Sequence, residues 1–117
     1  MTALSIDVEP TRIDVHAASS SSGCTVTVSG EVDSTTAPGL RNCLLEVISR
    51  PETSTVEIDL SAVTFLDSAG LSALAMAHRA ALAADRRLQM RCGTTRAVVR
   101  PLQITGLWSV FTVVDAV

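Results

Sequence analysis

The chain has 117 residues, of which 47% are hydrophobic and 18% are charged. This composition can supply the core of one domain, and it excludes intrinsic disorder of the whole chain. The formal net charge of −3 argues against the basic surface of a nucleic-acid-binding protein. The longest uncharged stretch late in the chain, residues 101–114, is shorter than the roughly 20 residues that a membrane helix needs, so we expect no membrane contact.

The cysteines and the first residues indicate a compartment. Cys24, Cys43 and Cys92 are odd in number and lack metal-binding spacing, which favours reduced, buried thiols. Residues 1–4 show no basic segment followed by an apolar one, so no signal peptide is predicted. We therefore expect a cytoplasmic protein.

Alternating apolar residues predict strands early in the chain. Residues 4–8 and 12–15 form one broken edge strand or two short ones, interrupted by Pro10. A run of serines predicts a flexible loop or hairpin tip over residues 17–23. The alternation resumes at residues 24–30, which predict another strand.

A helix and a strand are predicted next. The hydroxyl residues 34–36 can cap a helix that has Pro38 in its first turn and ends before Pro51. Residues 55–60 alternate again and predict a strand. Residues 61–66 predict a turn.

The second half of the chain repeats this order. Helical spacing predicts a helix over residues 68–84, and residues 87–93 predict a strand. A further helix over residues 94–106, capped by one of the two threonines at its start, is expected to kink or break at Pro101. A final strand is predicted at residues 110–114.

This alternation predicts a single α/β domain over residues 1–117, with no linker that would divide it. We expect a four- or five-stranded mixed, largely parallel sheet with helices packed mainly on one face. The predicted core includes Val26, Val28, Leu44, Ile58, Leu60, Leu74 and Val98.

The most informative segment covers residues 56–74, where a strand-rich stretch ends in Asp67-Ser68-Ala69-Gly70 and a helix begins. Free backbone N–H groups and the helix dipole converge there, so a phosphate on Ser68 would gain donors and a favourable field. The small residues that follow leave the hydroxyl accessible to another protein. A simpler interpretation is that Ser68 only caps the helix, worth about 1 kcal/mol, or that Asp67 does so in its place.

Three motifs together point to a known family. The first comprises Asp59-Leu60, Val63, Phe65-Leu66, Asp67-Ser68-Ala69-Gly70, Leu71 and Leu74. The second is Gly30-Glu31-Val32-Asp33, and the third, weaker motif is Ile104-Thr105-Gly106-Leu107. With these motifs at this spacing, the chain resembles STAS domains over about residues 4–114, in particular the anti-sigma factor antagonists.

The resemblance implies a STAS-like domain with a switch at Ser68. In such antagonists the serine of this motif is phosphorylated by a partner anti-sigma factor that is itself an ATP-dependent serine kinase. The unphosphorylated form binds that partner, which then releases its sigma factor. Phosphorylation weakens the complex, and a serine phosphatase restores it. We expect a monomer or weak dimer that makes no direct contact with nucleic acid.

The resemblance also places the partner contacts. They are expected at Asp33, Thr64, Leu66, Asp67, Ser68, Ala69, Gly70 and Leu71. Asp33 has the alternative of merely capping the first helix. Thr64 is either a second phosphorylation site or, more simply, a buried turn hydroxyl.

No catalytic arrangement is predicted. The serine motif is not the Gly-x-Ser-x-Gly elbow of hydrolases, and His78 lies roughly 15 Å farther along the same helix than Ser68. We expect His78 at the core or its boundary. The sequence shows no metal cluster or phosphate-binding glycine loop, so neither a cofactor nor a metal is expected. The arginines clustered in residues 86–100 predict a solvated face or, alternatively, a site for an acidic partner.

A second hypothesis keeps the fold without the switch. A STAS adaptor or scaffold subunit of a transport or stress-signalling complex would use the same docking site, and Ser68 would shape that site without being phosphorylated.

Overall fold

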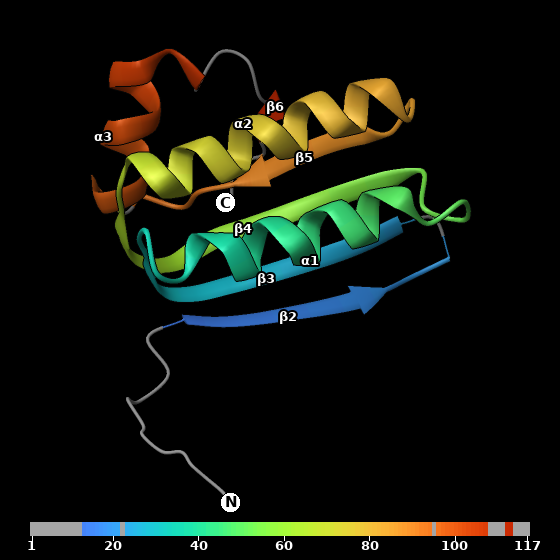
Figure 1. Cartoon of the computed structure of the whole chain (residues 1–117), viewed down its shortest axis with the longest axis horizontal. Coiled ribbons are helices and arrows are strands. Elements are labelled where there is room, and N and C mark those ends of the chain that lie inside the picture. Colours follow the sequence, from blue (N-terminus) through green and yellow to red (C-terminus); the bar gives the residue numbers. More distant parts are fainter. Residues whose placement is uncertain (1–12, 22, 95, 108–111, 114–117) are drawn as a thin grey trace, which may run out of the picture.

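The computed structural model describes residues 13–21, 23–94, 96–107 and 112–113. These residues form a five-stranded mixed sheet whose strand order follows the chain (Figure 1). The strands are β2 (Ile13–Ser19), β3 (Gly23–Val32), β4 (Thr55–Leu66), β5 (Arg87–Arg91) and β6 (Thr112–Val113). Strand β2 pairs antiparallel with β3, and the other neighbours pair parallel. The predicted mixed, largely parallel sheet is confirmed.

The first hairpin is tighter than its serine-rich sequence suggests. Strand β2 continues through residue 19, and Ala17 pairs with Val26 of β3. The N–H of Ser20 donates to the carbonyl of Gly23 at 2.8 Å and closes the turn. The loop expected over residues 17–23 is therefore wrong at both ends, because the ladder with β3 recruits its flanks into strands.

Residues 61–66, for which a turn is predicted, continue strand β4. Its buried residues alternate up to Leu60 and then recur every third position, at Val63 and Leu66. The pairing with β3 shifts register twice over this segment, which places two extra residues on β4. The turn prediction is wrong because β-bulges change the period of the apolar residues without ending the strand.

The helices of the described residues are α1 (Ala37–Ser49), α2 (Ser68–Ala83) and α3 (Arg96–Thr105). Helices α1 and α2 lie side by side over one face of the sheet, and α3 lies beside the start of α2 (Figure 1). As predicted, α1 has Pro38 in its first turn and ends at Arg50, whose extended backbone precedes a proline.

Helix α3 continues through Pro101 instead of breaking there. The neighbouring side chains of Val98 and Leu102 are completely buried, and this packing holds the helix together despite the missing backbone donor. Gly106, at a positive φ of 82°, follows the helix as expected of a helix-terminating glycine.

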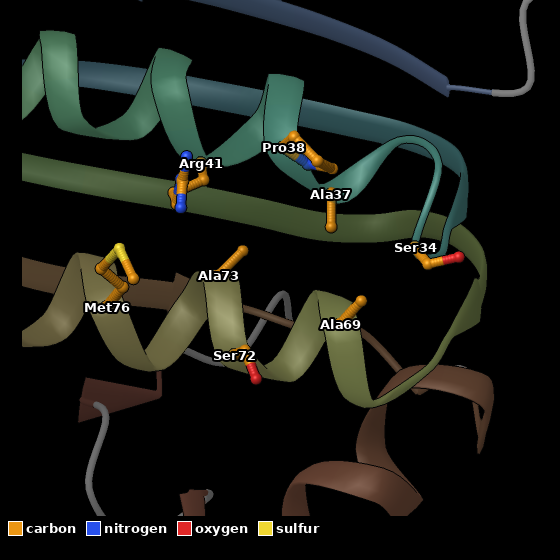
Figure 2. Close-up of a pocket in the computed structure, with 8 residues that line it drawn as sticks. All are labelled: Ser34, Ala37, Pro38, Arg41, Ala69, Ser72, Ala73 and Met76. Carbon is orange, nitrogen blue, oxygen red and sulfur yellow. The ribbon is translucent and has the colours of Figure 1, made fainter.

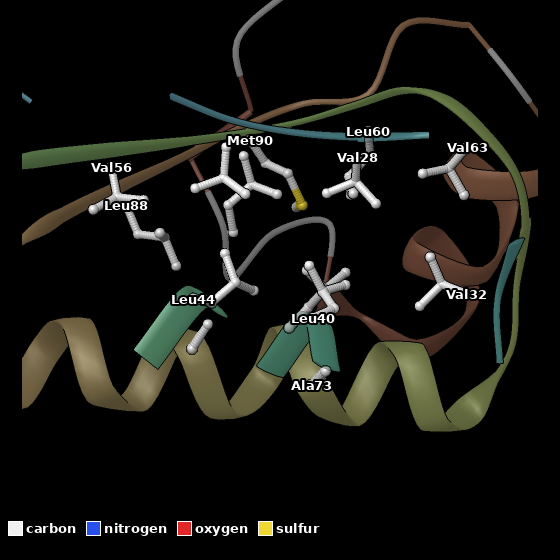
Figure 3. Close-up of a cluster of buried hydrophobic side chains, with 14 of the residues drawn as sticks. Val28, Val32, Leu40, Leu44, Val56, Leu60, Val63, Ala73, Leu88 and Met90 are labelled. Carbon is white, nitrogen blue, oxygen red and sulfur yellow. The ribbon is translucent and has the colours of Figure 1, made fainter. Parts of the chain in front are cut away.

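The hydrophobic core lies between the sheet and the two helices α1 and α2. Figure 3 shows valine, leucine and methionine side chains of the strands pointing toward leucines of α1 and an alanine of α2. All seven side chains predicted for the core are fully buried. On β3 the alternate residues, such as Thr25 and Thr27, point to the opposite, polar face of the sheet.

The ends of the chain add two observations. The strand predicted at residues 4–8 and most of the one at residues 110–114 lie outside the described residues. Among the helices of the described part, none has the length and apolarity needed to cross a bilayer.

Candidate functional site

Asp67, not Ser68, caps helix α2. Its Oδ1 accepts hydrogen bonds from the backbone N–H of Ala69 at 2.9 Å and of Gly70 at 3.2 Å. Its own backbone is extended, with φ −109° and ψ −170°, as an N-cap requires. Of the two capping interpretations of the sequence, the one that assigns Asp67 is confirmed.

Ser68 is consequently the first residue of the helix, and its side chain is exposed. Among the described residues, none forms a hydrogen bond with its hydroxyl. The hydroxyl therefore stands free at the positive end of a 16-residue helix. A group attached to its Oγ would project into solvent without disturbing the core.

Asp33 organises the corresponding turn at the start of α1. Its Oδ1 accepts from the N–H of Thr35 at 2.9 Å and of Thr36 at 3.1 Å. Thr36 is the N-cap residue of α1 but makes no side-chain capping bond, because its hydroxyl oxygen accepts from the N–H of Asp33 at 2.9 Å while the hydroxyl donates to the carbonyl of Glu31 at 2.9 Å. The prediction that hydroxyls of residues 34–36 cap the helix is therefore wrong, and the Asp33 carboxylate stabilises the turn that leads into it.

The motif at residues 30–33 and the motif around Ser68 lie side by side in the sheet, where Val32 of the first motif contacts the second. Val32 and Leu66 are register partners at the ends of β3 and β4, so Asp33 and Asp67 follow them at the same edge of the sheet. The N–H of Asp67 also donates to the carbonyl of Val32 at 3.2 Å. A methyl group at Gly70 would lie 2.8 Å from Val32 Cγ1, which explains why a glycine occupies this position. Asp33 thus lies at the same end of the sheet as Ser68, as expected.

The predicted contact residues differ in exposure. Thr64 is the extra residue of β4 at the second register shift, and its Oγ1 donates to the carbonyl of Gly30 at 3.2 Å. Its side chain is exposed, so the expectation of a buried turn hydroxyl is wrong. Leu66 and Gly70 are buried and support the surface from below. The remaining residues are half-buried at the surface beside Ser68: Asp33, Asp67, Ala69 and Leu71.

A groove of about 480 Å³ separates the start of α2 from α3, and the sequence did not reveal it. It is lined by Leu66, Asp67, Ser68, Leu71, Arg96, Arg100, Pro101, Ile104 and Thr105. Arg96 and Arg100 are exposed one helical turn apart, and Ile104 is 72% exposed. Ser68 thus lies on a groove that offers two guanidinium groups and an apolar surface.

The arginine cluster of residues 86–100 therefore does not form one solvated face. Arg86 reaches back to α1, where its Nε donates to the carbonyl of Ile48 at 3.1 Å. Arg91 pairs with Glu57 of β4 at 3.0 Å. Only the spacing of Arg96 and Arg100, four residues apart on one helix, contained the signal for a shared surface.

The remaining reactive side chains lie elsewhere. His78 is half-buried at the core boundary of α2, which agrees with its expected place. Cys24 and Cys92 are buried and Cys43 is half-buried, and all three are free thiols. Burial, followed by the negative charge of Asp59, raises the pKa of Cys92 to about 11. Within the described residues, no three potential ligands gather into a metal site.

Sequence comparison decides the family. The family model described as Mlab, STAS domain, matches residues 15–113, which is most of the chain. The chain belongs to the STAS-domain family. None of the curated proteins matches it in sequence.

Solved STAS-type structures share the fold. An anti-sigma factor antagonist from Mycobacterium paratuberculosis is 31% identical, with 90% of this chain and 87% of that chain covered and a TM-score of 0.79. SpoIIAA in its unphosphorylated form is 18% identical, with 89% of each chain covered and a TM-score of 0.75. The phosphorylated form of the Bacillus cell fate determinant SpoIIAA is 17% identical, with 89% and 92% covered and a TM-score of 0.70. The last two likenesses concern the fold alone.

Proposed function

We propose that this STAS domain is an anti-sigma factor antagonist that phosphorylation of Ser68 switches off. The observation that carries the proposal is the exposed Ser68 hydroxyl, which has no hydrogen-bond partner among the described residues and lies at the first position of α2. The antagonist from Mycobacterium paratuberculosis supports the general function, and the phosphorylated SpoIIAA shows that a protein of this fold accepts a phosphate.

The unmodified form binds a kinase-type anti-sigma factor, and the sigma factor is released. The Oγ of Ser68 then forms a bond to the γ-phosphorus of the kinase-bound ATP, while the bond from that phosphorus to the bridging oxygen of ADP breaks. The hydroxyl proton passes to a base of the kinase. A serine phosphatase reverses the modification by hydrolysis. The antagonist itself performs no catalysis and acts in the cytoplasm as a monomer or weak dimer, without contacting nucleic acid or membrane.

Charge explains why phosphorylation changes binding and not folding. A phosphoserine carries about −1.5 to −2 charges at pH 7. Next to Asp67 this charge opposes docking on an acidic or nucleotide-bearing surface of the partner. Within the domain the same charge is favourable, because Ser68 lies at the positive end of α2 and shares the groove with Arg96 and Arg100.

Binding measurements with variants of Ser68 test the proposal. Each kinase-type anti-sigma factor of the same genome is titrated with the wild type, Ser68→Ala and Ser68→Asp. We expect Ser68→Ala to bind in the presence of ATP without later release, and Ser68→Asp to bind at least about tenfold more weakly. Ser21→Asp is the matched control, because it adds the same charge in the exposed β2–β3 turn, at the opposite end of the sheet. Equal affinity of Ser68→Ala and Ser68→Asp would reject the switch, and a stable complex without modification would favour the adaptor.

A further inference from the structure

A second recess lies on the other side of α2, between this helix and α1 (Figure 2). Its volume is about 210 Å³, and it is lined by Ser34, Ala37, Pro38, Arg41, Ala69, Ser72, Ala73 and Met76. The walls are mainly apolar, because alanines of the two helices face each other across the gap. A recess of this size holds one extended side chain rather than a nucleotide.

Arg41 is the cation of this recess. In Figure 2 its side chain leaves α1 toward α2, where Met76 and Ala73 point toward it. The side chain is half-buried, and its Nε is fully buried and has no hydrogen-bond partner in the described part of the chain. The residues that line the recess include no carboxylate to pair with it.

Two other arginines show how unusual this is within the domain. The Nε of Arg86 donates to the carbonyl of Ile48, and the Nε of Arg91 donates to the carboxylate of Glu57. A buried N–H donor without an acceptor is destabilising, so buried donors are nearly always paired. Among the described residues, the Nε of Arg41 thus lacks the acceptor that the Nε atoms of Arg86 and Arg91 have.

We propose that the recess between α1 and α2 receives a glutamate side chain of the anti-sigma factor, whose carboxylate pairs with Arg41. A carboxylate supplies acceptors in the forked geometry that a guanidinium prefers, and the methylene groups of glutamate suit the apolar walls. The identity of the partner rests on the proposed function, whereas the carboxylate site itself rests on the recess and the unpaired Nε.

The location of the recess supports a docking role. Ser34 at its mouth directly follows Asp33, and Ala69 in its wall directly follows Ser68. The recess thus reaches the first turn of α2, one residue along the helix from Ser68. A partner that inserts an acidic side chain here carries negative charge beside Ser68, so phosphorylation of Ser68 repels that same element.

The site can be tested on the full chain alone with butyrate as the probe. Nitrogen-15 NMR spectra that resolve the arginine Nε–H groups are recorded while butyrate is added. We expect the Arg41 signal to shift and to saturate with a Kd on the order of millimolar, as six non-hydrogen atoms allow. The exposed Arg79 on the same helix pair serves as the internal control and should stay in place. Butyramide, which has the same shape without the charge, should not shift Arg41. An Arg41 signal that ignores butyrate, or that responds equally to butyramide, overturns the site.

A second arm decides the source of the carboxylate. Arg41→Gln is expected to weaken binding of the anti-sigma factor at least about tenfold, and Arg79→Gln to leave it unchanged. A shift with butyrate combined with unchanged partner binding by Arg41→Gln overturns the assignment to the partner and indicates a free carboxylate as ligand. If the wild type binds no anti-sigma factor, the proposed function fails, and the assignment to the partner fails with it, whereas the butyrate titration still decides the site.

Discussion

At the scale of single residues, Asp67 caps helix α2 and Ser68 presents a free hydroxyl, two roles that the sequence alone did not assign to separate residues. The Asp67 carboxylate takes the capping bonds of α2, and this releases the neighbouring hydroxyl for the surface. A serine that capped its own helix would have its oxygen engaged by backbone N–H groups and would be a poorer acceptor of phosphate. The separation of cap and hydroxyl is therefore the local condition for a modification site.

This division predicts different stabilities for two alanine variants. Asp67→Ala should lower the free energy of unfolding by about 1 kcal/mol, because two backbone donors lose their acceptor. Ser68→Ala should change it by less than about 0.5 kcal/mol, since the hydroxyl is exposed. Urea unfolding measures both, and Asp67→Asn, which keeps an acceptor oxygen, is the control. A larger loss for Ser68→Ala than for Asp67→Ala would contradict this assignment.

At the scale of elements, the start of α2 sits directly on the ends of β3 and β4. A Cβ at Gly70 would approach Leu66 Cδ1 to 2.5 Å and Val32 Cγ1 to 2.8 Å. Glycine thus lets the backbone of α2 approach the side chains of Leu66 and Val32 closely, and this close approach sets the distance of the helix from the sheet and the position of Ser68. The first turn of α2 is thus held by close packing as well as by its cap.

Two glycine-to-alanine variants test this packing. Gly70→Ala should lower the free energy of unfolding by about 1–3 kcal/mol, because the added methyl group overpacks a closed contact. Gly39→Ala is the matched control in α1, where a Cβ meets no atom within 4 Å among the described residues, and it should raise stability by about 0.5–1 kcal/mol. Thermal or urea unfolding gives both values. Equal effects of the two substitutions would refute the role of the contact.

The elements also show where sequence patterns stop being sufficient. The order of strands and helices follows from apolar periodicity, and it was predicted correctly from β3 to α3 within the described residues. The bulges of β4 were not, because an apolar spacing of three at Leu60, Val63 and Leu66 reads as irregular when the partner strand is unknown. Pro101 predicts a kink or a break in α3, and the burial of its neighbours explains why the helix does not break there.

At the scale of the whole molecule, function-related surfaces arise between elements that are distant in the chain. The motif at Ser68 was visible in the sequence because its residues are contiguous. The sequence did not show the groove with Arg96 and Arg100 or the recess with Arg41, since each forms only where two helices lie side by side. The sequence therefore singled out Ser68 as the candidate for modification but did not show the groove and the recess that lie on either side of α2.

The buried thiols give the whole domain a dependence on alkaline pH. Burial raises the pKa of Cys92 from an ordinary value near 9 to about 11. Between these values the unfolded chain loses the thiol proton while the folded chain retains it, so the free energy of unfolding should fall as pH rises from about 9 to about 11. Below pH 8 this thiol should contribute no pH dependence.

Urea unfolding at several alkaline pH values checks this expectation. The variant Cys92→Ala should show a shallower decline of stability with pH than the wild type, whatever its stability at pH 7. An identical decline in the two proteins would show that Cys92 ionises as freely in the folded chain as in the unfolded one.

The central claim is that the Ser68 hydroxyl is the acceptor of a regulatory phosphate. The most direct measurement incubates the full chain with a kinase-type anti-sigma factor that binds it and with ATP, and then maps the phosphate by mass spectrometry. We expect a single phosphate on Ser68, none on the exposed Thr64, and none at all in Ser68→Ala. A phosphate at another residue, or a partner that binds stably and transfers none, would contradict it.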